Sequence, residues 1–309
     1  LVLQGPAGAD VPSFYGANQY DRVAFTDGKD YFKAAVYING ANHGQFNTTW
    51  GRVDLSILKW FLNRGAIMPA EEQETVAKAL IAGFLEATLN GRKEYEQLFR
   101  NPLSGGAWLP KGLYLSQYAS SRTRQIANFE EDLNLESATL PGARLTGVNL
   151  TPWREEPPAM GSKRLRTSTG VRLEWDNGQS GPASYSLQLP AGFALNPAES
   201  ARLTFAVANA TKDQGPLDFT IMITDRVGET AALPLSSVMP LPPPLSYRRF
   251  KPPLKVPFAS EPVYTTYTIQ LTDFSVKNKA VALDHLARVS FIFDLSPKGA
   301  IFLDDIGFH

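Results

Sequence analysis

The chain changes character near residue 120, and this change constrains its fold more than any other feature of the sequence. Before it, short apolar runs alternate with a long helical pattern, which is typical of mixed α and β structure. After it, proline and glycine separate short stretches in which apolar and polar residues alternate, as in the strands of an all-β sandwich. The clearest of these stretches are residues 184–189, 202–207, 219–223, 264–271 and 289–293.

The length of 309 residues is enough for about two domains. We therefore predict an α/β domain over residues 1–102, a linker over 103–122 and an all-β sandwich over 123–309. A proline-rich segment, residues 240–257, interrupts the second domain. It predicts a long exposed loop, because proline donates no backbone hydrogen bond.

Two strands and one long helix are predicted in the first domain. Residues 1–5 (LVLQG) form a short apolar run that ends in glycine and proline, as in a buried parallel strand. Residues 31–38 (YFKAAVYI) are rich in aromatic and β-branched side chains and predict a second strand. Residues 69–90 predict a helix, because Pro69 stands in its first turn and Gly91 follows its end.

Composition excludes several classes of function. The chain carries 30 Lys and Arg against 30 Asp and Glu, a formal net charge of zero, so no overall field favours nucleic acid or an anionic membrane. It has no cysteine, which excludes a disulfide framework, a thiolate nucleophile and a cysteine-based zinc site. No apolar run approaches the roughly 20 residues that a membrane-spanning helix needs. We therefore expect neither a nucleic-acid partner nor a transmembrane segment.

Asp10 and His43 are the candidate catalytic residues. The chain has three histidines, and His43 follows the second strand directly, in the loop GANHGQFNTTWG. Asp10 lies in GPAGADV, on the loop that leaves the first strand, and loops that leave parallel strands open at the same edge of a sheet. A carboxylate that orients an imidazole is the acid–base pair of a serine hydrolase, and Asp before His matches the order of the α/β-hydrolase triad. Three other acids, Asp21, Asp27 and Asp30, lie further from the strand end and remain alternatives to Asp10.

These segments, together with YEQLFRNP after the helix, resemble the C-terminal quarter to third of a serine α/β-hydrolase. The resemblance is to the esterase and lipase branch that contains platelet-activating-factor acetylhydrolase-like and dienelactone-hydrolase-like enzymes. It implies a partial α/β-hydrolase core in which Asp10 is the triad acid and His43 is the triad base. It also implies that the complete parent needs no cofactor and acts on a small-molecule or lipid ester.

The chain departs from this family in one decisive respect. It contains no G-x-S-x-G motif, the nucleophile elbow that should precede the acid and the base. The nearest imitation, residues 178–182 (GQSGP), has proline in place of the last glycine and follows His43, so we interpret it as a turn. We therefore expect the nucleophile to lie upstream of Leu1 and these 309 residues to be inactive toward esters on their own. Two sheet edges are expected to stay open, which predicts poor solubility or marginal stability of the first domain.

The second domain resembles a carbohydrate-binding-module jelly roll. The segments that carry this resemblance are residues 126–132 (IANFEED), 267–274 (YTIQLTDF), 283–293 and 301–308 (IFLDDIGF). The resemblance implies that the first and last strands of the domain pair, and that a polysaccharide is a partner. Because such modules are common on secreted bacterial enzymes, it favours a secreted or periplasmic location.

A non-catalytic carbohydrate-binding protein is therefore the alternative function. Trp153, Trp175 and Tyr185 are candidates for an aromatic platform that stacks on a sugar ring, but each suits a protein core equally well. No platform residue is chosen among them. A metal hydrolase is disfavoured, because three dispersed histidines without an H-E-x-x-H motif supply too few ligands.

Acidic residues in the last strand raise one further question. Asp304 and Asp305 lie between apolar residues, and a buried acid needs a partner. A structural Ca²⁺ held by one of them with Glu130 is one interpretation, and hydrogen bonding to backbone or arginine is the favoured one. His285 lies between apolar residues and is interpreted as structural, and the terminal His309 is uninformative.

Overall fold

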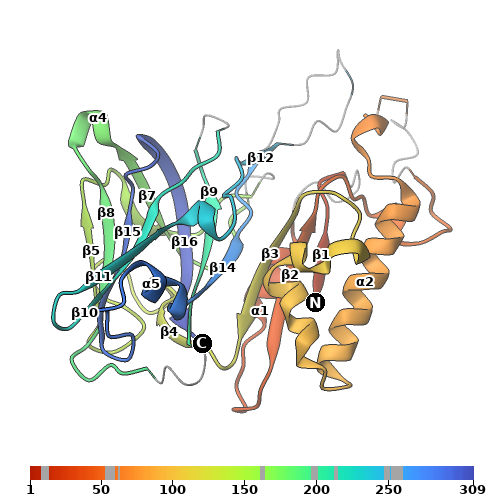
Figure 1. Cartoon of the computed structure of the whole chain (residues 1–309). Coiled ribbons are helices and arrows are strands. Elements are labelled where there is room, and N and C mark those ends of the chain that lie inside the picture. Colours follow the sequence, from red (N-terminus) through yellow and green to blue (C-terminus); the bar gives the residue numbers. More distant parts are fainter. Residues whose placement is uncertain are drawn as a thin grey trace. The chain divides into compact units, whose positions relative to one another are not determined.

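The computed structural model describes residues 1–7, 14–52, 60–61, 63–160, 164–195, 201–211, 215–246, 251 and 260–309. The chain divides into two compact units (Figure 1). Unit 1 contains residues 1–121, 159–167 and 245–265, and unit 2 contains residues 122–158, 168–244 and 266–309. Two segments that interrupt the second half of the sequence thus belong to unit 1.

Unit 1 is built on a three-stranded sheet in the order β1-β2-β3. Strands β1 (Val2–Gln4) and β2 (Phe32–Ile38) are parallel, and β2 and β3 (Tyr114–Ser120) are antiparallel. The strands predicted at residues 1–5 and 31–38 are thus confirmed, and so is their parallel pairing. Strand β3 lies in residues 103–122, where the sequence predicted a linker, and it pairs with the side of β2 away from β1. Among the described residues, β1 pairs with β2 alone.

Short and long helices complete this unit. They are α1 (Gly16–Arg22), η1 (Gly44–Phe46), η2 (Arg64–Ala66), α2 (Ala70–Thr88), η3 (Lys93–Glu96), α3 (Gln97–Arg100) and η4 (Pro102–Trp108). The helix predicted at residues 69–90 is confirmed as α2. Two acids in its first turn, Glu71 and Glu72, interact favourably with the positive end of the helix dipole.

The sheet of unit 1 is covered on both faces. Alternate residues of β2, including Val36 and Ile38, pack with Val76 and Leu80 of α2 in one buried cluster. The residues between them face the other way, and Tyr37 packs there with Phe14 and Leu115. Both faces of β2 are apolar because both are buried, which explains its continuous hydrophobic run.

The segments inserted from later in the sequence carry two short strands. Strands β12 (Leu245–Ser246) and β13 (Ser260–Glu261) pair with each other, and Leu245 packs against the cluster of Phe14, Tyr37 and Leu115. These residues fall in or next to the proline-rich segment that predicted an exposed loop. Most of that segment, residues 247–250 and 252–257, lies outside the described residues.

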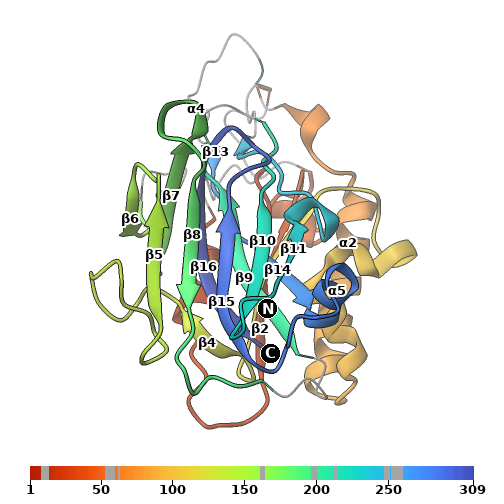
Figure 2. The ribbon, with the colours of Figure 1, turned by 60° about the vertical axis from the view of Figure 1, so that its left-hand side comes forward.

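Unit 2 is a β-sandwich of two mainly antiparallel sheets (Figure 2). One sheet has the order β11-β10-β15-β8-β5, and the other has the order β14-β9-β16-β7-β6, with β4 also paired to β16. The first sheet contains β5 (Arg144–Val148), β8 (Ser184–Gln188), β10 (Thr220–Asp225), β11 (Thr230–Pro234) and β15 (Leu286–Ile292). The second contains β4 (Arg124–Ala127), β6 (Trp153–Glu156), β7 (Gly170–Asp176), β9 (Arg202–Asn209), β14 (Thr265–Gln270) and β16 (Lys298–Phe308). Three short helices, α4 (Asn177–Ser180), η6 (Leu235–Ser237) and α5 (Leu271–Lys277), lie in the connections.

The core of unit 2 confirms the predicted β-sandwich. Inward side chains from both sheets form one large cluster, which includes Phe205, Phe291 and Phe293. The pairing of β4 with β16 joins the first and last strands of the unit, as predicted. Residues 178–180 of the stretch that imitates the nucleophile elbow lie in α4, which is a single helical turn. The carboxylate of Asp176 caps this turn by accepting from the backbone N–H of Gly178. The interpretation of the stretch as a local turn is thus confirmed.

Candidate functional site

The chain segments that leave β1 and β2 meet at the same edge of the sheet. The backbone N–H of Ala7 donates to the carbonyl oxygen of Ala41 (2.9 Å). A Cβ atom on Gly5 would lie 2.3 Å from that same oxygen, so only glycine permits the approach. Parallel pairing of β1 with β2 therefore continues beyond the strands as contact between the two loops that follow them.

His43 lies on the second of these loops, at the N-terminal end of η1, and its side chain is exposed. Its imidazole packs edge-on against the indole of Trp50, with 5.2 Å between ring centroids and 82° between ring planes. Trp50 is held by a tight turn, because the side-chain oxygen of Asn47 accepts from the backbone N–H groups of Thr49 and Trp50 (2.9 Å each). The histidine is thus exposed to solvent beside the indole of Trp50.

A buried network of three amide side chains holds the loop on both sides of His43. Gln73 of α2 is fully buried, its Nε2 donates to the carbonyl of Asn42 (2.7 Å), and its Oε1 accepts from the backbone N–H of Asn42 (3.1 Å). The Nε2 of Gln45 donates to Gln73 Oε1 (3.0 Å) and to the carbonyl of Met68 (2.8 Å). Asn42 Oδ1 accepts from the backbone of Gln45 (2.8 Å). Because buried polar groups are costly unless paired, this network favours one conformation of the histidine loop.

Asp10, the predicted acid, lies outside the described residues, so its role stays a prediction. The three alternative acids are each engaged by other groups. Asp21 accepts from Arg166 at 2.5 and 3.2 Å, and Asp30 forms an ion pair with Lys93 (3.0 Å). Asp27 accepts from the backbone of Lys29 (3.2 Å) and from Tyr31 (3.1 Å), and these hydrogen bonds lower the pKa of its carboxyl group.

The aromatic candidates for sugar stacking do not form an exposed platform in unit 2. Trp175 is buried, stacks on Phe293 (4.2 Å) and donates from Nε1 to the carbonyl of Ser296 (2.8 Å). Tyr185 is fully buried, and Trp153 is half-buried with its ring edge-on to Tyr185 (5.9 Å). All three therefore serve the sandwich core. The aromatic side chains that the described part of the chain exposes, Tyr31, Trp50, Trp60, Phe61 and Trp108, belong to unit 1.

The outward face of the five-stranded sheet is a polar surface. Two neighbouring rows cross its strands: one runs Thr146, Ser186, Ser290, Met222 and Ala232, and the other runs Arg144, Gln188, Arg288, Thr224 and Thr230. Ser186 and Ser290 share a hydrogen bond between their hydroxyl groups (2.8 Å). Arg288 and Thr224 are paired residues of the neighbouring strands β15 and β10. The Nε of Arg288 and the hydroxyl oxygen of Thr224 are buried and have no hydrogen-bond partner among the described residues.

The acids considered for calcium are held by protein groups instead. Glu130 accepts from the hydroxyl of Ser168 (2.9 Å) and the backbone N–H of Thr169 (2.7 Å). Asp304 is buried and accepts from the backbone N–H of Asp305 (2.7 Å). Within the described ranges, no three His, Cys, Asp or Glu side chains are grouped so that they could hold a metal ion. These donors fit the hydrogen-bonded interpretation of Glu130 and Asp304.

One acid in unit 2 has an unusual titration. Burial, reinforced by the carboxylates of Glu131 and Asp132, raises the pKa of Glu155 to about 7. The side chain lies on β6, two residues after Trp153 and on the same face of the strand. An acid that points inward from an edge strand discourages pairing with other chains.

Membrane insertion through a helix has no support in the described residues, since none of their helices is long and apolar enough to cross a bilayer.

Comparison with known proteins identifies no family. No protein-family model matches the chain, and no curated protein matches it. Among solved structures, a family 30 carbohydrate-binding module is similar with a TM-score of 0.36 and 14% identity, covering 50% of this chain and 72% of that one. A family 11 carbohydrate-binding module of a cellulosomal cellulase of Clostridium thermocellum has a TM-score of 0.35 and 12% identity, covering 60% and 93%. An exo-β-agarase has a TM-score of 0.38 and 14% identity, covering 60% and 24%.

The assignment of unit 2 as a β-sandwich rests on the strand pairing of this chain.

Proposed function

We propose that this chain supplies the acid and the base of a serine-dependent carboxylic-ester hydrolase, with the β-sandwich as an accessory domain. The serine nucleophile and the oxyanion hole would come from residues outside the 309 described by this sequence, which contains no G-x-S-x-G motif. The proposal assigns His43 as the base and Asp10 as the acid. On this assignment the chain alone does not turn over esters.

One observation carries the proposal: the loops after β1 and β2 are joined by the hydrogen bond from Ala7 to Ala41. Asp10 follows Ala7 by three residues, and His43 follows Ala41 by two. The buried amides around His43 support the same assignment, because a general base must be held in one orientation. The exposure of its imidazole leaves the ring accessible to a nucleophile and a substrate.

The chemistry follows from these positions. The imidazole of His43 takes the proton of the serine hydroxyl as the oxygen attacks the ester carbonyl, and it returns that proton to the leaving alcohol. A carboxylate at Asp10 keeps the imidazole in the required tautomer and stabilises the imidazolium. Water then attacks the acyl-enzyme with His43 as the base a second time.

The test is ester hydrolysis by a polypeptide in which a segment that carries a G-x-S-x-G nucleophile elbow precedes these 309 residues. We expect His43→Ala and Asp10→Asn each to lower kcat on a p-nitrophenyl ester by several orders of magnitude, about 10⁴-fold for the acid. His285→Ala is the matched control, since His285 is an exposed histidine of unit 2. Near-normal turnover by His43→Ala would exclude the proposal.

Polysaccharide binding by unit 2 is the second candidate function. It is favoured by the polar outward face of the five-stranded sheet, where Arg144, Gln188 and Arg288 lie in one row across three strands and the first two are exposed. Hydroxyl-rich ligands suit such a face, because they donate and accept hydrogen bonds in rows. The binding surface would then be hydrogen-bonding and not aromatic.

Retardation in native gels that contain a soluble polysaccharide tests this candidate on the chain itself. We expect xylan or a mixed-linkage glucan to retard the chain, and Arg144→Ala and Gln188→Ala to weaken the retardation. Lys277→Ala, an exposed change on α5, is the control. Equal mobility with and without every polysaccharide tested would rule the candidate out.

A further inference from the structure

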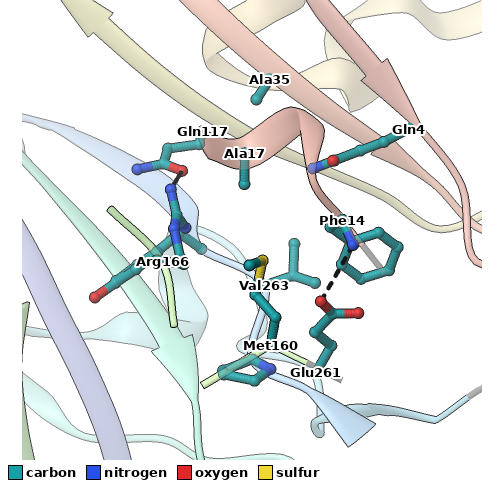
Figure 3. A pocket seen from close by; sticks show the side chains of 11 residues that line it. Gln4, Phe14, Ala17, Ala35, Gln117, Met160, Arg166, Glu261 and Val263 are labelled. Carbon is teal, nitrogen blue, oxygen red and sulfur yellow. Dashed lines mark hydrogen bonds between the residues drawn. The ribbon is translucent and has the colours of Figure 1, made fainter. Parts of the chain in front are cut away.

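A small hollow lies on one face of the sheet of unit 1, over β2. Ala35 of β2 points to this face, and so does its paired residue Gln117 of β3. Gln4 of β1 points the same way, because it pairs with Tyr37, two residues after Ala35. Since alanine fills little space, Ala35 leaves a hollow of about 20 Å³ between the two glutamines (Figure 3), which is enough for about one water-sized group.

Each of the two segments inserted from later in the sequence adds one charged side chain to this hollow. Arg166 is buried, and its guanidinium donates to both oxygens of Asp21 on α1 (2.5 and 3.2 Å) and to Gln117 Oε1 (3.0 Å). Glu261 of β13 is also buried, and its Oε1 accepts from the backbone N–H of Phe14 (3.2 Å). Figure 3 shows Arg166 and Glu261 on opposite sides of the hollow. A ligand with a net charge would therefore face a like charge on one of these sides.

The remaining wall of the hollow is mainly apolar. It includes Phe14, Met160 and Val263. The ring of Phe14 packs edge-on against Tyr37, with ring centroids 4.9 Å apart and an angle of 81°, and Val263 packs against the same cluster. A few polar groups that converge within an apolar wall are typical of sites for small molecules.

The amide of Gln4 points to a ligand in this hollow. Figure 3 shows the end of its side chain directed into the hollow. Its Oε1 is buried against α1, where a Cβ atom on Gly16 would lie 3.1 Å away, and it has no hydrogen-bond partner among the described residues. A buried acceptor without a partner is costly, so a group that donates to Gln4 from within the hollow would be bound favourably.

We infer that this hollow binds the primary carboxamide group of a small neutral molecule. A carboxamide donates and accepts hydrogen bonds in one plane, so it can pair with both the oxygen and the nitrogen of the Gln4 amide. It carries no net charge, which suits a hollow that lies between Arg166 and Glu261. The volume admits only the amide end of such a molecule, and the apolar wall suits its hydrocarbon part. The site requires no ester chemistry, so it can be tested on this chain alone.

Titration with acetamide, followed in ¹H–¹⁵N spectra, tests the site directly. We expect acetamide to shift the side-chain amide resonances of Gln4 saturably, with a Kd of about 1–10 mM. Sodium acetate and methylammonium chloride supply an anion and a cation of similar size, and each should bind at least about tenfold more weakly. The side-chain amide of Gln97, which is exposed on α3, should not shift and is the internal control.

Two variants give the second readout, on the backbone amides of Ala17 and residue 35. Gln4→Leu nearly keeps the side-chain volume but removes the amide, so it should weaken acetamide binding at least about tenfold. Ala35→Val fills the hollow without changing a polar group, should also weaken binding, and serves if Gln4→Leu does not fold. Gln97→Leu is the matched control and should leave the Kd unchanged. No saturable shift up to about 0.1 M acetamide, equal affinity for acetate, or an unchanged Kd in Gln4→Leu would each overturn the inference.

Discussion

Gln73 is the residue whose replacement tests most sharply how the histidine loop is held. It is a fully buried amide on the apolar stripe of α2, and it makes three hydrogen bonds to the loop. Gln73→Leu nearly keeps the volume of the side chain. It removes the hydrogen-bond partners of both the backbone N–H and the carbonyl oxygen of Asn42. Gln45 keeps its bond to Met68, so the cost comes mainly from Asn42.

The magnitude follows from these lost partners. A buried donor left unpaired costs about 1–3 kcal/mol, and a lost hydrogen bond about 1 kcal/mol. We therefore expect Gln73→Leu to lower the free energy of unfolding of unit 1 by roughly 2–4 kcal/mol. Gln97→Leu, at an exposed glutamine of α3, should change it by less than about 0.5 kcal/mol.

The five tryptophans are distributed over both units, so their fluorescence reports on the unfolding of both. Hydrogen exchange of the α2 amides is therefore the suitable assay for unit 1. The protection of these amides measures the stability of unit 1 alone. If Gln73→Leu changed that stability no more than Gln97→Leu does, the reasoning about the buried network would be refuted.

Because burial raises the pKa of Glu155 to about 7, above its ordinary value of 4.5, the folded state loses stability as pH rises through that range. Glu155→Gln should therefore raise the unfolding free energy by about 1 kcal/mol at pH 8 and hardly at pH 4, in urea titrations at both pH values. Gly5→Ala places a Cβ atom 2.3 Å from the carbonyl oxygen of Ala41. In calorimetry it should lower the melting temperature, and it should lower the free energy of unfolding by about 1–3 kcal/mol. An unchanged melting temperature would contradict the close approach. Arg166→Ala leaves the carboxylate of Asp21 buried without its cation and should cost about 3–5 kcal/mol, most of which Asp21→Leu in the same chain should recover in a double-mutant cycle.

The sequence predicted those elements whose pattern is local. The helix at residues 69–90 has its own start and stop signals, and the strand at residues 31–38 has a composition that suits few other structures. Sandwich strands such as β8 and β11 alternate because each buries mainly one face, whereas β9 is buried along nearly its whole length. The pairing of β4 with β16 was predicted from resemblance and not from any local pattern.

The elements that were missed depend on distant partners. Strand β3 lies among glycine and proline residues, which pointed to a linker, and its conformation is decided by the pairing with β2. Arg166 and Glu261 carry no local signal, because their partners Asp21 and Phe14 lie more than 140 positions away. No periodicity of the sequence shows that these two segments belong to unit 1.

The candidate site was predictable only in part. His43 follows a strong strand signal within a polar loop, and it lies at the predicted edge of the sheet. The one available signal for the network was missed: Gln73 is a polar residue at a position of α2 that the helical period places on the buried face. Its partners Asn42 and Gln45 flank the histidine, and a buried amide needs such partners.

The tautomer of His43 is the measurement that tests the central claim most directly, and it can be made on this chain without the nucleophile. With three histidines, long-range ¹H–¹⁵N spectra resolve each ring. We expect neutral His43 to carry its proton on Nδ1. Its downfield resonance should disappear or shift in Asp10→Asn and persist in Asp21→Asn, Asp27→Asn and Asp30→Asn. An Nε2-protonated ring, or an Nδ1 proton unaffected by Asp10→Asn, would contradict the pairing of Asp10 with His43.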